Sequence, residues 1–357
     1  MIQSLVAKNE SMDKSEVIKS VRDVQIADAI VFVGGLPACG KSLMTAIIGS
    51  FNRVEIQKYN YTIEHLCSLH YLGCIEEDVA TTMIRMQTDM DLYNMMMSRE
   101  TNFRFKDSSS IFKSPRPFRY LRRLFNPGET ETIERIKREK PILNILVHNV
   151  MTHSASLAKA VGPAFHLIEI VRHPLYMIKQ WHLYIDRYAK DARDFTVWFD
   201  YKGHSLPFFV KGWEDLYIRS NPMDRVIHSI RHLFETNFRV FDELPPEQKA
   251  NVLTVPFEKM VKDPMPYIHG IQKLLNTCMT SSTRRELKKQ NVPRKMIADS
   301  AILPIYKKYG WEPPEKKSDE RWELNKRREF AAQHASSEAM KVLDRICQEY
   351  EDRWQVP

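Results

Sequence analysis

Residues 35–42, with the sequence GLPACGKS, place the strongest constraint on how this chain can fold. They follow the apolar run at residues 29–33 and precede residues 43–48, which can continue as a helix. A strand, a glycine loop and a helix in this order form a P-loop, in which successive backbone N–H groups face one anion. The start of the helix adds positive potential, and Lys41 adds a full charge. We therefore expect the loop to bind a phosphate-bearing ligand.

The rest of the chain alternates strand-like and helical segments. Residues 141–148 and 165–171 are apolar runs that predict buried strands, and helical segments follow them at 155–161 and 175–189. This alternation predicts a parallel sheet with right-handed crossovers. We predict an α/β class: a three-layer P-loop fold with a central, mainly parallel sheet flanked by helices, a β-hairpin insertion at about residues 194–210, and a helical C-terminal tail.

The length of 357 residues allows one large α/β domain with additions. We expect that domain to span residues 1–310 and a helical C-terminal extension, residues 311–357, to pack on it. Residues 12–28 read as a polar helix before the first strand. Residues 317–354 read as one long charged helix on the surface of the domain.

Composition limits the classes of partner. The net charge of +8 suits an anionic ligand or nucleic acid, but the chain has no RRM, KH or zinc-finger signature, so we expect no nucleic-acid partner. The five cysteines match neither a zinc motif nor a disulfide framework. No apolar run approaches the roughly 20 residues of a membrane helix, and the N-terminus lacks the features of a secretory signal. We expect a cytoplasmic protein without a membrane partner; the sequence does not specify its oligomeric state.

The residues at the predicted strand ends favour one chemistry over another. A P-loop kinase normally places an aspartate at the end of an apolar strand to hold magnesium. Here the predicted strand segments 142–147, 167–171 and 252–257 are followed by His148, Arg172 and Glu258, of which Glu258 is the best remaining acidic candidate. Two neutral or basic strand ends suit the transfer of a group that carries less negative charge than a phosphoryl group, without an obligatory metal.

The order of these motifs resembles the sulfotransferase family that uses 3′-phosphoadenosine 5′-phosphosulfate (PAPS). Residues 172–174, Arg-His-Pro, look like the Arg-x-Pro segment of that family, and residues 255–264, VPFEKMVKDP, look like its Tyr-Glu-Asp-Leu … Asp-Pro segment. The resemblance implies transfer of a sulfuryl group from PAPS to a hydroxyl or amine of a small-molecule or glycan acceptor, with PAP as the product and no metal required.

Two positions depart from the family pattern. Ala38 stands where the family has a basic residue, and Lys41 follows the second glycine as in loops that bind nucleoside triphosphates. Gln180 stands where the family has a serine, eight residues after Arg172. The first departure leaves a metal-dependent P-loop kinase that uses ATP as an alternative, and a nucleotide-binding protein without turnover is a second one.

The resemblance implies a role for each matching residue. The P-loop would hold the 5′-phosphosulfate, with Lys41 stabilising charge on the bridging oxygen. Arg172 would pair with the 3′-phosphate, assisted by Gln180. Arg294 and Lys295 would close over the same phosphate, unless they belong to a solvated basic loop. The expected nucleotide-binding residues are Gly35, Pro37, Ala38, Cys39, Gly40, Lys41, Ser42, Leu43, Arg172, Gln180, Arg294 and Lys295.

Catalysis and acceptor binding are assigned to polar residues beside the predicted strand ends. His148 is the expected general base, because an imidazole with a pKa of about 6.5 suits proton removal near neutral pH. Glu64, Asp107 and His153 are alternatives. Segments that mix aromatic and hydrogen-bonding side chains suit a sugar, a phenol or an anionic metabolite equally. The expected acceptor-binding residues are Asn102, Arg104, Asp107, Tyr120 and Trp198.

Overall fold

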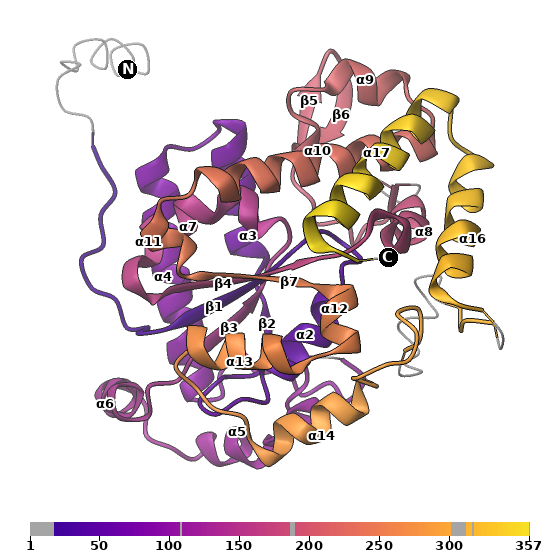
Figure 1. The fold of residues 1–357 in the computed structure, drawn as a ribbon. Helices are drawn as coiled ribbons and strands as arrows, with labels where there is room; N and C mark the ends of the chain where they lie inside the picture. The colour runs from indigo at the N-terminus through magenta and orange to yellow at the C-terminus, as the bar shows by residue number, and fades with distance from the viewer. Residues whose placement is uncertain (1–17, 108, 186–189, 301–311, 316–317, 357) are drawn as a thin grey trace, which may run out of the picture.

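A parallel sheet forms the centre of the protein. The computed structural model describes residues 18–356, except 108, 186–189, 301–311 and 316–317. In this part of the chain, five parallel strands lie in the order β2-β3-β1-β4-β7 (Figure 1). The strands are β1 (Ile30–Gly34), β2 (Lys58–Tyr59), β3 (Leu143–Leu146), β4 (Phe165–Val171) and β7 (Val252–Pro256). The predicted α/β class is confirmed.

The central strand supplies side chains to two cores. Ile30 and Phe32 belong to one hydrophobic cluster, and Val31 and Val33 belong to the other, because successive side chains of a strand point to opposite faces of its sheet. One face is covered by α3 (Tyr61–Leu72), α4 (Glu77–Met96) and α7 (Ser154–Val161), and the other by α2 (Lys41–Ile48), α12 (Phe257–Lys262) and α13 (Met265–Leu274) (Figure 1). These are the three predicted layers.

The remaining elements surround this frame. The predicted hairpin is confirmed as the antiparallel pair β5 (Trp198–Tyr201) and β6 (His204–Pro207). The further α-helices of the described residues are α5 (Pro117–Arg123), α6 (Glu129–Glu139), α8 (Pro174–Ile185), α9 (Glu214–Arg219), α10 (Pro222–Glu243), α11 (Pro246–Lys249), α14 (Ser281–Lys289), α16 (Glu320–Ala332) and α17 (Ser337–Trp354). Among the described residues, no helix has the length and apolar character needed to cross a membrane.

The C-terminal tail differs from the predicted single surface helix. It forms two helices, α16 and α17, and the Ser336 side chain caps α17 by accepting a hydrogen bond from Ala339 N–H. Leu343, Ile346 and Tyr350 share one face of α17 at helical spacing, and they are buried in the same cluster as the helices α8 and α10. The apolar stripe makes this helix part of the main core.

The segment before β1 is also different from its prediction. Residues 18–28 are not helical, and the other part of the predicted helix, residues 12–17, lies outside the described residues. The carboxylate of Asp89 in α4 accepts hydrogen bonds from the N–H groups of Ile26 and Ala27 and from the Arg22 side chain. These bonds hold the segment against α4 and replace the bonds that a helix would make.

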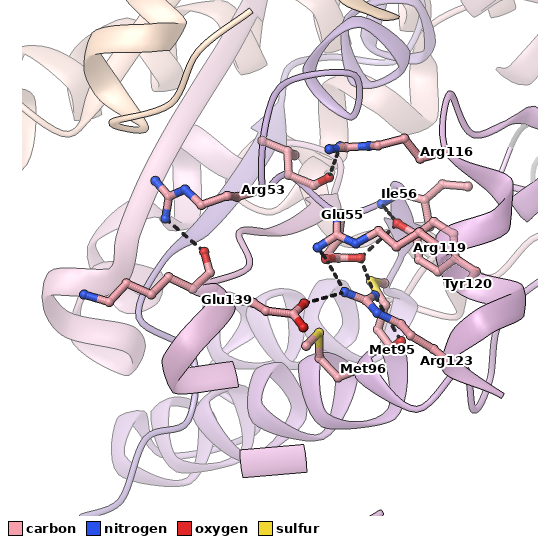
Figure 2. A network of polar contacts seen from close by, with 12 residues as sticks. Arg53, Glu55, Ile56, Met95, Met96, Arg116, Arg119, Tyr120, Arg123 and Glu139 are labelled. Carbon is pink, nitrogen blue, oxygen red and sulfur yellow. Dashed lines mark hydrogen bonds and ion pairs between the residues drawn. The ribbon is translucent and has the colours of Figure 1, made fainter. Parts of the chain in front are cut away.

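A buried ion cluster joins α5 to the segment that follows α2 (Figure 2). The Glu55 carboxylate is fully buried. It pairs with Arg123 at 2.8 Å and Arg119 at 2.8 Å and accepts a hydrogen bond from the Tyr120 hydroxyl at 2.9 Å. Burial raises the pKa of Glu55, but the two guanidinium groups outweigh that effect and lower it. Glu55 is therefore ionised at neutral pH and holds α5 in place.

Arg116 extends this cluster to the end of the P-loop helix. Its guanidinium donates to the carbonyl oxygens of Gly49, Phe51 and Val54 at 3.3, 2.7 and 2.9 Å. Gly49 is the C-cap of α2, where a cation interacts favourably with the helix dipole. The basic residues of α5 and its N-cap therefore stabilise the fold.

We predict that Glu55→Gln destabilises the protein by about 3 kcal/mol, because it leaves the buried Arg123 guanidinium with the more distant Glu139 carboxylate, 3.8 Å away, and removes the acidic partner of Arg119. Urea unfolding followed by circular dichroism measures the change. The matched control is Glu134→Gln, which removes an exposed carboxylate that pairs with Lys137 and is expected to change stability by less than about 0.5 kcal/mol. Equal effects of the two substitutions would contradict the prediction.

Candidate functional site

The P-loop backbone turns sharply between β1 and α2. Gly35, Ala38 and Gly40 have φ angles of 126°, 71° and 103°, and such positive values let neighbouring N–H groups converge on one point. Gly40 is the N-cap of α2. A Cβ at Gly40 would lie 2.3 Å from the Phe257 ring, so this position requires glycine. The loop therefore has the backbone shape that an anion-binding P-loop needs.

Three side chains hold the loop in this shape by donating hydrogen bonds to its carbonyl oxygens. The bonds run from Lys41 Nζ to Gly35 O at 2.6 Å and Leu36 O at 2.8 Å, from Trp181 Nε1 to Pro37 O at 2.8 Å, and from Arg172 Nη1 to Ala38 O at 2.9 Å. Trp181 and Arg172 come from α8 and from the end of β4, so the loop is braced by the neighbouring strand-to-helix connection. Side chains of the protein itself therefore support the loop conformation.

A cavity of about 1530 Å³ opens in front of the loop. Its walls include Lys41, Ser42, His148 and Arg172, which follow β1, β3 and β4 in the chain. Ligands of parallel α/β sheets bind beyond these carboxyl ends. Pockets for one small molecule usually measure about 300–1,000 Å³. This cavity therefore has room for a nucleotide and a second substrate side by side.

His148 is paired with Glu64 inside this cavity. The Nδ1 atom of His148 lies 3.1 and 3.2 Å from the two Glu64 carboxylate oxygens. Glu64 lies in the first turn of α3, 84 residues before His148. In the neutral imidazole, an Nδ1–H that donates to the carboxylate leaves Nε2 as the unprotonated nitrogen. The pair therefore fixes the tautomer in which Nε2 can accept a proton.

The alternative bases are placed differently. Burial raises the pKa of Glu64, but the charge and hydrogen bonds of His148, with Lys41, outweigh that effect and lower it, so Glu64 is a weak base. Asp107 lines the cavity and pairs with Arg104 at 3.4 Å. His153 is buried, which lowers its pKa to about 4, and it does not line the cavity. Of these groups, His148 is the best placed to accept a proton.

Arg172 lies between the P-loop and two aromatic rings. Its guanidinium carbon is 4.3 Å from the centre of the Phe257 ring and 5.3 Å from that of Tyr176. Burial is the main cause that lowers the pKa of Arg172, although a guanidinium remains cationic at neutral pH. Phe257 also contacts Gly40. This ring therefore connects the β7–α12 segment with both the P-loop and Arg172.

The structure brings most of the expected nucleotide-binding residues to the cavity. Pro37, Ala38, Gly40, Lys41, Ser42, Leu43, Arg172, Gln180 and Arg294 line it. Gly35 and Cys39 are buried behind the loop, and Lys295 is exposed and lies outside the cavity wall. The Arg294 guanidinium donates to backbone carbonyls of its own segment, at residues 290, 291, 297 and 299. The Arg294 side chain is thus held largely by the backbone of its own segment.

The expected acceptor-binding residues are less well gathered. Asp107 lines the cavity, whereas Asn102 and Arg104 contact Asp107 within the same loop. Trp198 does not line the cavity, and its Nε1 donates to Asp194 at 3.2 Å. Tyr120 is only 1% exposed, because its ring is buried in the Glu55 cluster. The expectation that Tyr120 contacts the acceptor is corrected: it is a structural residue.

A P-loop kinase would need an acid at a strand end, and Glu258 is the candidate for that position. Its carboxylate is instead hydrogen-bonded to other parts of the fold. Its carboxylate accepts hydrogen bonds from His173 N–H at 2.9 Å and from the Tyr350 hydroxyl at 2.6 Å, and it does not line the cavity. Among the described residues, no group of three or more His, Cys, Asp or Glu side chains is arranged to hold a metal ion. Glu258 therefore connects the Arg-His-Pro segment to α17.

The sequence patterns did not predict that helix α16 forms one wall of the cavity. Helix α16 contributes Glu323, Lys326, Arg327 and Phe330, although its residues read as a charged surface helix. The only signal in the sequence was the concentration of charge between residues 317 and 328, which is equally typical of a solvated face. Contact with α8 turns this part of the helix toward the cavity.

Comparisons with known proteins complete the description. No protein-family model matches the chain, and no curated protein sequence matches it. The chain is similar to the sulfotransferase domain from the Synechococcus PCC 7002 olefin synthase, with a TM-score of 0.38, 13% identity, and coverage of 88% of this chain and 98% of that one. It is also similar to sulfotransferase STF9 from Mycobacterium avium (TM-score 0.34, 14% identity, 80% and 77% covered) and to mouse sulfotransferase SULT7A1 complexed with PAP (0.34, 12%, 76% and 65%). All three of these solved structures are sulfotransferases.

A buried acid lies behind the P-loop. Glu169 of β4 is 2% exposed, and Asn237 Nδ2 donates to its Oε1 at 3.3 Å. Its Oε2 has no hydrogen-bond partner among the described residues. Burial raises the pKa of Glu169 to about 8, against the opposing charge of Lys41. The carboxyl group is therefore mostly protonated at neutral pH.

We predict that Glu169 makes the protein less stable as the pH rises. Its pKa is about 8 in the folded state and about 4.5 in the unfolded chain. Between these two pH values the folded state binds one more proton than the unfolded chain. The resulting contribution to the free energy of unfolding is complete below about pH 4.5 and is lost as the pH rises toward 8. The loss is at most about 1.4 kcal/mol per pH unit. Urea unfolding at pH 5.5, 7.0 and 8.5 compares wild type with Glu169→Gln, which remains neutral. The variant is expected to gain stability relative to wild type with rising pH; parallel profiles would contradict this.

Proposed function

We propose that this protein transfers a sulfuryl group from PAPS to a hydroxyl or amine of a small-molecule or glycan acceptor, and releases PAP. One observation carries the proposal: the P-loop opens into the same cavity as the His148–Glu64 pair, in which His148 follows strand β3, where a phosphoryl-transfer enzyme would place an acid. The size of the cavity supports a reaction between two substrates held together.

Each of the site residues has a separate role in such a reaction. PAPS supplies the sulfuryl group. His148 Nε2 accepts the proton of the acceptor as its oxygen or nitrogen attacks sulfur, and Glu64 stabilises the imidazolium that forms. The N–H groups at the start of α2 stabilise the negative charge that develops on the departing phosphate oxygen, and Lys41, whose Nζ holds the loop carbonyls of Gly35 and Leu36, adds its positive charge beside them. Arg172, next to the loop, binds the 3′-phosphate.

Two alternatives remain distinct from this proposal. Lys41 and Ser42 follow Gly40 as they do in loops that bind nucleoside triphosphates, which supports a metal-dependent kinase that uses ATP. A nucleotide-binding protein without turnover needs the same loop and no base. Ligand selectivity separates the first alternative from a sulfotransferase, and the His148 variant separates the second.

We predict that PAP stabilises the protein selectively. At about 100 times its dissociation constant, a ligand of the folded state adds about 2.7 kcal/mol of stability, which corresponds to a rise of several degrees in the melting temperature. Thermal-shift measurements compare PAP with ATP and GTP, each with and without magnesium. Stabilisation by ATP only with magnesium, and none by PAP, would refute the sulfotransferase proposal.

We predict that His148→Ala lowers kcat by about 10²- to 10⁴-fold, the usual contribution of a general base, and leaves PAP affinity within about twofold. Sulfation of a panel of phenols and oligosaccharides with PAPS measures kcat, and calorimetry measures PAP binding. The matched control is His204→Ala, on the exposed side of the hairpin, which should change neither value.

The alternative bases are tested in the same assay. Glu64→Gln should lower kcat less than His148→Ala, because it removes only the partner of the imidazole, and Asp107→Asn should have a smaller effect still. Unchanged turnover in His148→Ala would remove this residue as the base. Tight PAP binding with no sulfation across the panel would favour a protein without turnover.

A further inference from the structure

We propose that Arg327, on helix α16, binds the 3′-phosphate of the nucleotide together with Arg172. This inference rests on the proposed function, because the 3′-phosphate is the group that distinguishes PAPS and PAP from other adenine nucleotides. It makes the C-terminal extension part of the nucleotide site.

The two arginines meet at one aromatic ring. The guanidinium carbons of Arg327 and Arg172 lie 4.7 and 5.3 Å from the centre of the Tyr176 ring, and both residues line the cavity. They come from distant parts of the chain, one from α16 and the other from the end of β4. The Tyr176 hydroxyl donates to Glu320, the first residue of α16, at 2.9 Å. This bond fixes the start of α16 beside α8.

The charges of the two arginines are incompletely balanced. Glu323 lies 3.3 Å from Arg327, whereas no carboxylate of the described residues forms an ion pair with Arg172. The positive charge of Arg327 adds to burial in lowering the pKa of Arg172, against the opposing effect of Glu258. Both guanidinium groups face the Tyr176 ring, and an anion in the cavity beside them would offset their positive charges.

Neither guanidinium has all of its N–H donors satisfied within the described residues. The Nε atoms of Arg172 and Arg327 are buried and have no hydrogen-bond partner among the described residues. A phosphate monoester carries a charge of about −1.5 to −2 near neutral pH and three acceptor oxygens. Planar guanidinium groups match such oxygens in bidentate fashion. The chemistry of the pair thus suits a phosphate dianion better than a single carboxylate.

The position of the pair assigns that phosphate to the nucleotide. Arg172 donates to the P-loop carbonyl of Ala38 at 2.9 Å, so the pair lies beside the site of the 5′-phosphosulfate. Gln180, which stands where the family that the motifs resemble has a serine, donates its Nε2–H to the Tyr184 hydroxyl at 2.7 Å. Because the Gln180 amide donates to Tyr184, Arg327 would supply hydrogen-bond donors to the phosphate in its place.

The test compares two nucleotides that differ only in the 3′-phosphate. Isothermal calorimetry measures the dissociation constants of PAP and AMP for wild type, Arg327→Ala and Arg327→Lys. Wild type is expected to bind PAP more tightly than AMP. Arg327→Ala should weaken PAP binding by about tenfold to hundredfold, the size of a lost charge-assisted hydrogen bond, with AMP binding changed less than about twofold. Arg327→Lys, which keeps the charge without the bidentate geometry, should give an intermediate PAP affinity.

The matched control is Arg321→Ala, which removes an exposed arginine from the same helix and should leave both affinities unchanged. Thermal melts confirm that each variant is folded. If Arg327→Ala binds PAP as wild type does, or loses PAP and AMP binding equally, the inference is wrong and the proposed function stands. If wild type does not bind PAP, the proposed function fails and the inference fails with it.

Discussion

Parallel pairing of β1 with β3 on one side and β4 on the other is the constraint on which the site depends. Val33 is in register with Leu146 of β3 and with Ile168 of β4, so the segments that follow the three strands emerge at one edge of the sheet. Those segments carry the P-loop, His148 and Arg172. The hydrogen bond from Arg172 to the Ala38 carbonyl then braces the loop from its neighbour. The P-loop turn, a tethered imidazole and a guanidinium are thereby held around one cavity.

The excess of basic residues serves two purposes in this protein. In and beside α5, Arg116, Arg119 and Arg123 bind a buried carboxylate and the carbonyls at the end of the P-loop helix. Around the cavity, Arg172 and Arg327 have unpartnered Nε atoms among the described residues. Net charge alone could not separate these uses, because both require cations and only the location of a counter-ion distinguishes them. The first group stabilises the fold, and the second is positioned to bind an anion.

Sequence patterns predicted those parts of the site that follow directly from strands. Buried runs and the glycine loop identified β1, β3 and β4, and with them the residues at their carboxyl ends. Sequence patterns predicted the role of a polar residue poorly where both a buried structural position and a position in the site were plausible. In the sequence, Tyr120 is an aromatic residue beside basic residues, which is typical of both positions. Its hydrogen bond to the fully buried Glu55 carboxylate shows that it has a structural role. Similarly, the charges of α16 resemble a solvated face until α8 is placed beside them.

The sequence by itself determined the P-loop, the alternation that produces a parallel sheet, and the identity of His148 and Arg172 at strand ends, because these depend on local spacing and on the period of the strands. Tertiary structure decided the partners of these residues. Glu64 reaches His148 from helix α3, and Arg327 reaches Tyr176 from the C-terminal extension. Such pairs join segments far apart in the chain, and their formation depends on how helices pack on the sheet, which no local periodicity records.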